Sequence, residues 1–188
     1  SYGYQSVHER WLRSHLEAGI DIENISDRRT GFQIAGPMAR TVLAEVTRAD
    51  VSAESFLFMD VKRMPVGMCD CIVQRLSYTG DLGYEIYTDA MDQRSLWETL
   101  FAAGQKHGMR PFGMRAMMSL RLDKFFGSWL SEFSPDYTPA ETGMDRFVAF
   151  NKGADFIGRS AVEAERQSGA ARKLVIFEVD ADDADAVG

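Results

Sequence analysis

Cysteine and histidine are both rare in this sequence, which contains only Cys69 and Cys71 of the first kind and His8, His15 and His107 of the second. Two cysteines cannot make the several bridges of a disulfide-stapled miniprotein, and a structural zinc site needs four ligands, commonly with C-x-x-C spacing. The histidines show no H-E-x-x-H spacing. We therefore predict no metal site, and we expect the two cysteines to pack on one face of a strand.

Long apolar runs and clusters of basic residues are also missing. The longest apolar runs, such as residues 56–59, are far shorter than the ~20 residues that cross a bilayer. Lysine and arginine number 21 against 28 acidic residues, a net charge of −7, and no basic cluster is longer than a pair. Because non-specific affinity for nucleic acid depends on basic charge, we expect neither a membrane nor a nucleic acid as a partner.

The remaining composition is that of a globular protein. Of the 188 residues, 45% are hydrophobic and 11% aromatic, which excludes disorder and collagen-like repeats. A chain of this length can bury a full core, so one or two domains are expected. The sequence opens with Ser1 rather than methionine, and a strand predicted at 173–179 has little chain after it to pair with. We therefore expect a fragment of a longer protein.

The order of predicted elements indicates the fold class. Amphipathic spacing predicts helices at 7–16, after Gly36-Pro37, at 92–107, at 113–126 and at 160–167. Runs of β-branched and apolar residues predict strands at 32–35, 59–66, 69–78, 84–88, 147–150 and 173–179, with a loop at 127–139. No G-x-G-x-x-G or P-loop motif accompanies them. The sequence therefore predicts an α+β fold of antiparallel sheets with packed helices rather than a dinucleotide-binding fold.

The segment 75–87 has a composition that a core does not require. Strand alternation places Tyr84 and Ile86 on one face and Glu85 and Tyr87 on the other. A carboxylate beside an aromatic ring suits a planar ligand with adjacent N–H donors, because a carboxylate accepts two parallel hydrogen bonds. A β-hairpin with solvent-facing Glu and Tyr side chains is the alternative, and the sequence leaves both interpretations open.

The methionine-rich helix predicted at 113–126 contains two arginines. Such a helix is typical of core packing rather than of a binding surface. Arg115 and Arg121 are six residues apart, so one of them interrupts the apolar side of the helix. Since a buried unpaired charge is costly, that arginine needs a carboxylate partner. The partner is either Glu85 or a ligand, or else Asp123 or Asp81.

Five motifs follow one another along the chain: S-Y-T-G-D-L-G-Y-E at 77–85, G-M-R-A at 113–116 with S-L-R-L-D-K at 119–124, Y-T-P at 137–139, E-T-G at 141–143, and D-F-I-G-R at 155–159. In this order they resemble the aminomethyltransferase family, the T-protein of the glycine cleavage system, over nearly the whole chain. The segments 11–13 and 112–119 look most like the folate-binding half of dimethylglycine and sarcosine dehydrogenases.

This resemblance implies a cofactor and its binding residues. The cofactor would be tetrahydrofolate, bound in a central cavity of a three-domain α+β protein, and the reaction would be transfer of a one-carbon unit (aminomethyl or methylene) from an aminomethyl donor or a small methylamine-type substrate. The pterin-recognising Glu of the family falls at Glu85, and the Tyr of its S-Y-T-G motif at Tyr78. Tyr84 would help to shape the pocket. Arg121 of the L-R-L-E motif would stabilise Glu85 or the ligand, and Arg115 is a further candidate for the folate carboxylates.

The sequence departs from the family pattern at two points. Asp123 stands where the family motif has Glu. The catalytic Asp of the family lies well upstream of the S-Y-T-G motif, so we expect it before Ser1, and the catalytic residue stays unassigned. By this resemblance, residues 1–167 form a partial folate-binding domain, and residues 168–188 a linker with the first strand of a truncated C-terminal β-barrel.

The resemblance leaves the details of function open. In a dehydrogenase parent, FAD would lie on a separate domain, and this part would capture the one-carbon unit. The alternatives are a non-catalytic folate-binding module and a related folate-dependent demethylase with another methyl donor. The expected location is cytoplasmic, or the mitochondrial matrix in a eukaryote. The sequence indicates no oligomeric state.

Overall fold

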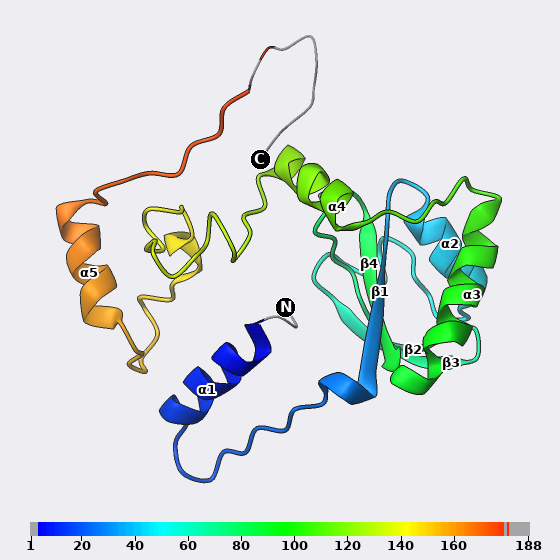
Figure 1. The fold of residues 1–188 in the computed structure, drawn as a ribbon, viewed down its shortest axis with the longest axis horizontal. Helices are drawn as coiled ribbons and strands as arrows, with labels where there is room; N and C mark the ends of the chain where they lie inside the picture. Colours follow the sequence, from blue (N-terminus) through cyan, green and yellow to red (C-terminus); the bar gives the residue numbers. More distant parts are fainter. Residues whose placement is uncertain (1–3, 179, 181–188) are drawn as a thin grey trace. The chain divides into compact units, whose positions relative to one another are not determined.

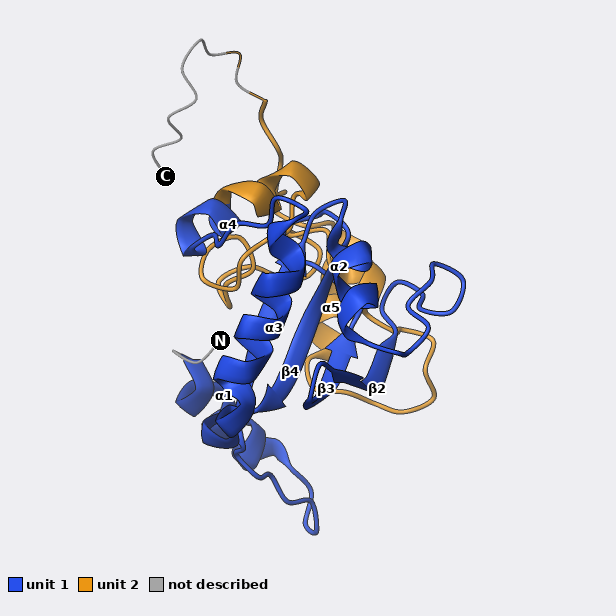
Figure 2. Ribbon diagram, turned by 90° about the vertical axis from the view of Figure 1, so that its right-hand side faces the viewer, with its two compact units in different colours: residues 1–118 blue, residues 119–188 orange. Residues whose placement is uncertain are grey.

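The computed structural model describes residues 4–178 and 180, and the chain divides into two compact units, residues 1–118 and 119–188 (Figure 1, Figure 2). A four-stranded antiparallel sheet lies in the first unit. The strand order is β1-β4-β3-β2. The bounds are Arg29–Ala35 for β1, Val61–Val66 for β2, Cys69–Gln74 for β3 and Gly83–Asp89 for β4. The four strands predicted for this stretch are confirmed, and β4 lies in the interior of the sheet.

Two helices cover one face of the sheet. They are α2, Ala39–Val46, and α3, Gln93–Gln105, and both are close to their predicted positions (Figure 1). Their apolar sides are buried against the strands, with Leu43 of α2 and Leu96 of α3 fully buried. Asp92 occupies the N-cap position of α3, although its side chain makes no capping hydrogen bond. The other core residues include Phe56, Met64, Val66, Val73, Tyr84 and Ile86.

The hairpin of β2 and β3 requires a glycine at its turn and buries both cysteines. Gly67 at the turn has φ +60°, and a Cβ added there would lie 2.8 Å from the Thr99 side chain, so the turn requires glycine for both conformation and space. Cys69 and Cys71 are buried on the core face of β3 with free thiols, as predicted. Burial raises the pKa of Cys71 to about 11. That thiol is therefore protonated and unreactive at neutral pH.

The methionine-rich segment differs from its prediction as a buried helix over 113–126. The helix there, α4, spans only Met114–Leu120, and a 3-10 turn follows at Arg121–Lys124 and ends at Phe125, whose φ is 54°. No residue of α4 is buried, and Met114 is 67% exposed. Apolar periodicity indicates a helix, but it does not identify the layer that would have to pack on the helix to bury it.

Two further helices are confirmed, α1 at Gln5–His15 and α5 at Arg159–Ser168, and residues 127–139 form a loop as predicted. Every helix of the described residues is too short or too polar to cross a membrane. Within the same residues, no group of three or more His, Cys, Asp or Glu side chains is arranged to hold a metal ion.

Two strands predicted for the second unit are wrong as far as the structure describes them. A 3-10 turn at Asp145–Phe147 leads into irregular chain where a strand was expected at 147–150, and residues 173–178 form no strand, while Val179 lies outside the described residues. A strand needs a neighbour that completes its backbone hydrogen bonds. The N–H of Leu174 instead donates to the carbonyl of Glu141, at 2.8 Å. The division into 1–167 and a barrel start at 168–188 stays a prediction.

Candidate functional site

The face of the sheet opposite α2 and α3 carries the polar residues of the candidate site. Side chains alternate along each strand, so the residues that do not enter the core point to this second face. We call it the polar sheet face and define it by Gly31 and Gln33 of β1, Gln74 of β3, and Glu85 and Tyr87 of β4. The side chains of Gln33, Gln74, Glu85 and Tyr87 are half-buried. The predicted alternation along β4 is confirmed.

Strand register aligns three of these residues in a row. Glu85 is directly opposite Gln33 of β1 on one side and Gln74 of β3 on the other. Directly opposed residues of antiparallel strands have Cβ atoms about 5 Å apart. A carboxylate is thus flanked on both sides by amides, which carry donors as well as acceptors.

A short hydrogen bond connects the two β4 residues of this face. The Tyr87 hydroxyl donates to Oε2 of Glu85 at 2.6 Å. Burial, the hydrogen bond to Glu85 and the charge of that carboxylate raise the pKa of Tyr87 to about 12. The hydroxyl therefore keeps its proton at neutral pH and acts as a donor to the carboxylate. Among the described residues Tyr87 supplies the hydrogen bond that Glu85 receives, which leaves Oε1 and a second lone pair of Oε2 for a ligand.

The S-Y-T-G loop lies beside Gln33. Nε2 of Gln33 donates to Oγ of Ser77 at 3.3 Å, and the hydroxyl oxygens of Ser77 and Thr79 are 2.7 Å apart. Thr79 is buried, and Tyr78 between them is half-buried. The loop is thus fixed next to Gln33, which belongs to the row formed by Gln33, Glu85 and Gln74.

Tyr84 is not on the polar sheet face, contrary to its predicted place in the pocket. Its side chain is fully buried on the core face of β4, with its ring centroid 5.6 Å from that of Phe56. Its hydroxyl has no hydrogen-bond partner among the described residues, and burial raises its pKa. Tyr84 is therefore a core residue, which follows from the same alternation that exposes Glu85.

The isolated hydroxyl of Tyr84 leads to a prediction about stability. Tyr84→Phe removes a buried polar group that makes no hydrogen bond and keeps the ring, so we expect the free energy of unfolding to rise by about 1 kcal/mol. Urea unfolding followed by circular dichroism measures this change. A fall in stability of similar size would mean that the hydroxyl has a partner in solution.

Arg121 has a different partner from those predicted. In the second unit its guanidinium binds Glu132 through Nη1 at 3.1 Å and Nη2 at 3.0 Å, and it donates to the carbonyl of Phe126 at 2.7 Å. Within the second unit the carboxylate partner is therefore Glu132 and not Asp123. Glu132 is in a loop eleven residues away, where helix spacing gives no signal.

The environment of Glu132 favours its charged form. Burial raises its pKa, but hydrogen bonds from Arg121, from the Ser131 hydroxyl and from the N–H of Ser128 outweigh burial and lower the pKa to about 2. Arg115, by contrast, is exposed on α4. The contacts of Arg121 are structural, and a contact of either arginine with folate stays a prediction.

An apolar cavity of about 620 Å³ lies along the outer edge of β1 in the first unit. Trp97 and Phe101 of α3, which stack with ring centroids 5.3 Å apart, form part of its wall. Met114 and Met117 also line it, so these methionines border a cavity rather than fill the core. The cavity shares Gly31 and Gln33 with the polar sheet face. Its other polar lining side chains are His107 and Arg110.

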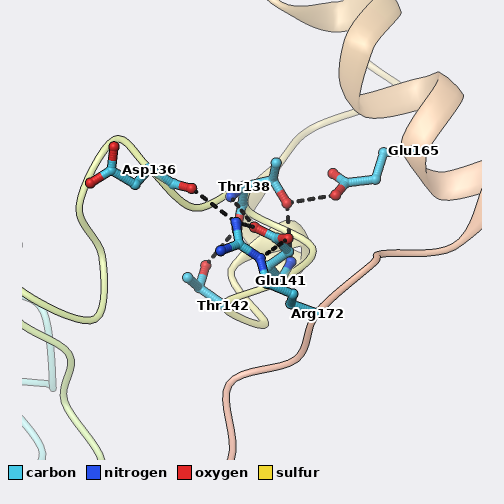
Figure 3. Close-up of polar contacts among 6 residues, drawn as sticks. All are labelled: Asp136, Thr138, Glu141, Thr142, Glu165 and Arg172. Atoms are coloured by element: carbon cyan, nitrogen blue, oxygen red, sulfur yellow. Dashed lines mark hydrogen bonds and ion pairs between the residues drawn. The ribbon is translucent and has the colours of Figure 1, made fainter.

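A second polar cluster lies in the second unit, where the Y-T-P and E-T-G motifs fall (Figure 3). Glu141 is only 6% exposed and accepts hydrogen bonds from Nε of Arg172 at 2.9 Å and from the N–H of Thr138 at 3.1 Å. The Thr138 hydroxyl donates to Glu165 of α5 at 2.7 Å. Hydrogen bonds from Arg172 and then Thr138 lower the pKa of Glu141. These contacts connect the 138–142 turn with α5 and with the segment after α5.

Comparison with known proteins adds family information. The family model of the GCVT N-terminal domain matches residues 1–152. The mitochondrial dimethylglycine dehydrogenase of Mus musculus is 38% identical over 182 residues, which cover 95% of this chain and 21% of that protein. An aminomethyltransferase of Geobacillus sp. (strain WCH70) is 36% identical over 170 residues, which cover 90% of this chain and 46% of that protein.

The chain therefore spans about a fifth of the length of the dehydrogenase and just under half that of the aminomethyltransferase. Among solved structures, the heterotetrameric sarcosine oxidase from Corynebacterium sp. U-96 in complex with pyrrole 2-carboxylate matches with a TM-score of 0.47 and 16% identity. That match covers 58% of this chain and 54% of the other.

Proposed function

The chain belongs to the GCVT N-terminal domain family, and on this basis we propose that it is part of an enzyme that transfers one-carbon units with tetrahydrofolate. In this proposal the pterin ring of tetrahydrofolate binds at the polar sheet face. The family assignment made from the five motifs agrees with the family model and with both relatives. The activity of the whole protein, its substrate and its compartment are part of the proposal, because the chain spans only a fraction of each relative.

One observation supports the pterin site above the others, and it is the arrangement around Glu85. One carboxylate oxygen is bound by Tyr87, and amides stand directly opposite on both neighbouring strands. A pterin is planar and has adjacent N–H donors on one edge, which a carboxylate accepts as parallel hydrogen bonds. The amides of Gln33 and Gln74 match the mixture of donors and acceptors on the rest of that edge. The residues present therefore fit the cofactor that the family implies.

The chain supplies binding and orientation in this proposal. Bound tetrahydrofolate would carry the one-carbon unit, while Glu85 holds the ring in position and the S-Y-T-G loop closes one side of the site through Ser77 and Thr79. The apolar cavity next to Gln33 offers a recess for less polar parts of a ligand. The similarity to dimethylglycine dehydrogenase favours a methylated amine as donor and a flavin on a separate domain of the parent.

Calorimetry with tetrahydrofolate tests the proposed function. We expect saturable binding to the protein as its gene encodes it, and much weaker binding of p-aminobenzoylglutamate, which lacks the pterin. The reason is that the proposed contacts are made to the pterin edge. Equal affinities for the two compounds, or no binding of either, would contradict the pterin site. The 188-residue chain measured in parallel shows how much of the affinity it provides by itself.

A further inference from the structure

We propose that Tyr87 and Gly31 act together as positioning residues for Glu85: the Tyr87 hydroxyl fixes the orientation of the carboxylate, and Gly31 provides the space that the Tyr87 ring needs. This inference rests on the proposed pterin site, because it assigns a task to residues beside Glu85. Neither residue lies in the motifs from which the family was predicted. Tyr87 is two positions after Glu85, the last residue of the first motif.

Tyr87 reaches Glu85 because the two are neighbours on one face of β4. Residues i and i+2 of a strand point the same way, and the long tyrosine side chain reaches its hydroxyl back to the carboxylate. The bond of 2.6 Å has the length of a charge-assisted hydrogen bond. A glutamate side chain has three rotatable bonds and loses rotamer freedom when it binds a ligand. A carboxylate that is already held by a hydrogen bond loses less rotamer freedom when the ligand binds, which increases affinity.

Gly31 is a glycine for reasons of space rather than backbone conformation. Its φ is outside the left-handed region, unlike that of Gly36 or Gly67 in the same unit. The register places Gly31 directly opposite Tyr87. A Cβ added at Gly31 would lie 2.7 Å from Cδ1 and 2.8 Å from Cε1 of the Tyr87 ring. Glycine inside a strand lowers strand stability and commonly marks a close approach, and here the ring makes that approach.

The other side of Tyr87 is also occupied. Ile72 of β3 is directly opposite Tyr87, so the tyrosine lies in a row between Gly31 and Ile72 across three strands. The register thus places an apolar residue on one side of Tyr87, and the ring lies against Gly31 on the other. The hydroxyl is thereby directed along the strand toward Glu85.

Binding measurements on Tyr87→Phe and Gly31→Ala test the proposal. Tyr87→Phe keeps the ring and removes the hydroxyl, so we expect affinity for tetrahydrofolate to fall about tenfold. Gly31→Ala displaces the ring and should produce a similar loss. Tyr137→Phe and Gly153→Ala are the matched controls: Tyr137 is half-exposed in the second unit, and an added Cβ at Gly153 meets no atom within 4 Å. Both controls should bind like the wild type.

A double-mutant cycle separates positioning from general packing. If Tyr87 acts through Glu85, then Tyr87→Phe has no further effect on affinity in a Glu85→Ala background. A tenfold loss in both backgrounds, or wild-type affinity of Tyr87→Phe, would overturn the proposal.

A measurement without ligand distinguishes failure of this inference from failure of the proposed function. The tyrosine ¹³Cζ resonances report ionisation of each hydroxyl, and Tyr87→Phe identifies the signal of Tyr87. Glu85→Gln removes the negative charge beside Tyr87, so Tyr87 should ionise at lower pH in that variant than in the wild type. An unchanged titration would refute the contact itself. Absence of tetrahydrofolate binding by the wild type, together with a shifted titration, would refute the pterin site and leave the contact established.

Discussion

Glutamine in place of Glu85 is expected to weaken tetrahydrofolate binding by about 100-fold. The substitution preserves the shape of the side chain but replaces one carboxylate oxygen with an amide that donates. In the proposed site the ligand edge also presents N–H donors. One hydrogen bond is therefore replaced by two N–H donors that face each other, and the other is made to a neutral amide oxygen instead of a charged carboxylate oxygen. Hydrogen bonds to charged groups contribute about 1.5–3 kcal/mol each, so the loss of one of them accounts for an effect of about 100-fold.

The fold should tolerate this substitution. Tyr87 can still donate to the amide oxygen of glutamine, and Glu85 is only half-buried. Asp70→Asn is the matched control, because Asp70 is an exposed acidic residue of the adjacent strand β3 and its loss changes the net charge equally. Calorimetry should give wild-type affinity for Asp70→Asn. If both variants lost affinity to the same extent, the effect would be one of net charge, and Glu85 would not be a specific contact.

The sequence identified part of this site because strand alternation is a local property. Glu85 and Tyr87 are two residues apart, and the pattern of β4 alone separates them from Tyr84. Gln33 and Gly31 could not be found in this way. They join the site through the pairing of β1 with β4, about fifty residues apart, and no local pattern specifies a register over that distance. Gly31 also precedes the strand predicted at 32–35, so it was not recognisable as a glycine inside a strand.

The same contrast between local patterns and contacts distant in sequence distinguishes the two units. In the first, strands and helices with strong periodicity pack on one another, so α3 and the β2–β3 hairpin agree with their predicted positions. In the second, apolar runs at 147–150 and 173–178 have the composition of strands but form none in the described residues. Side chains such as Arg172 and Glu141 connect the segments there, over thirty-one residues. Composition predicts an element only where a partner exists to complete it.

The buried ion pair of the second unit should have the largest effect on stability. Glu132→Ala leaves the guanidinium of Arg121, whose side chain is 6% exposed, without its carboxylate, and we expect residues 119–134 to lose about 3 kcal/mol of local stability. Hydrogen exchange of the backbone amides in that range measures this loss. Glu163→Ala is the matched control, since it breaks the more exposed pair with Arg159 of α5 and should change stability by about 0.5 kcal/mol at most.

The cost of Glu132→Ala comes from the unpaired charge, and two further measurements separate this cause from simple loss of packing. Arg121→Met combined with Glu132→Leu removes both charges and should recover most of the lost stability. The wild type should also depend on pH through Glu132, whose pKa falls from 4.5 to about 2 in the folded protein. The unfolded state then binds the proton more tightly, so this contribution is present above pH 4.5 and is lost as pH falls through about 2. Glu132→Gln should lack this dependence. If its protection declined over the same range as that of the wild type, other carboxylates would control the acid sensitivity of the unit.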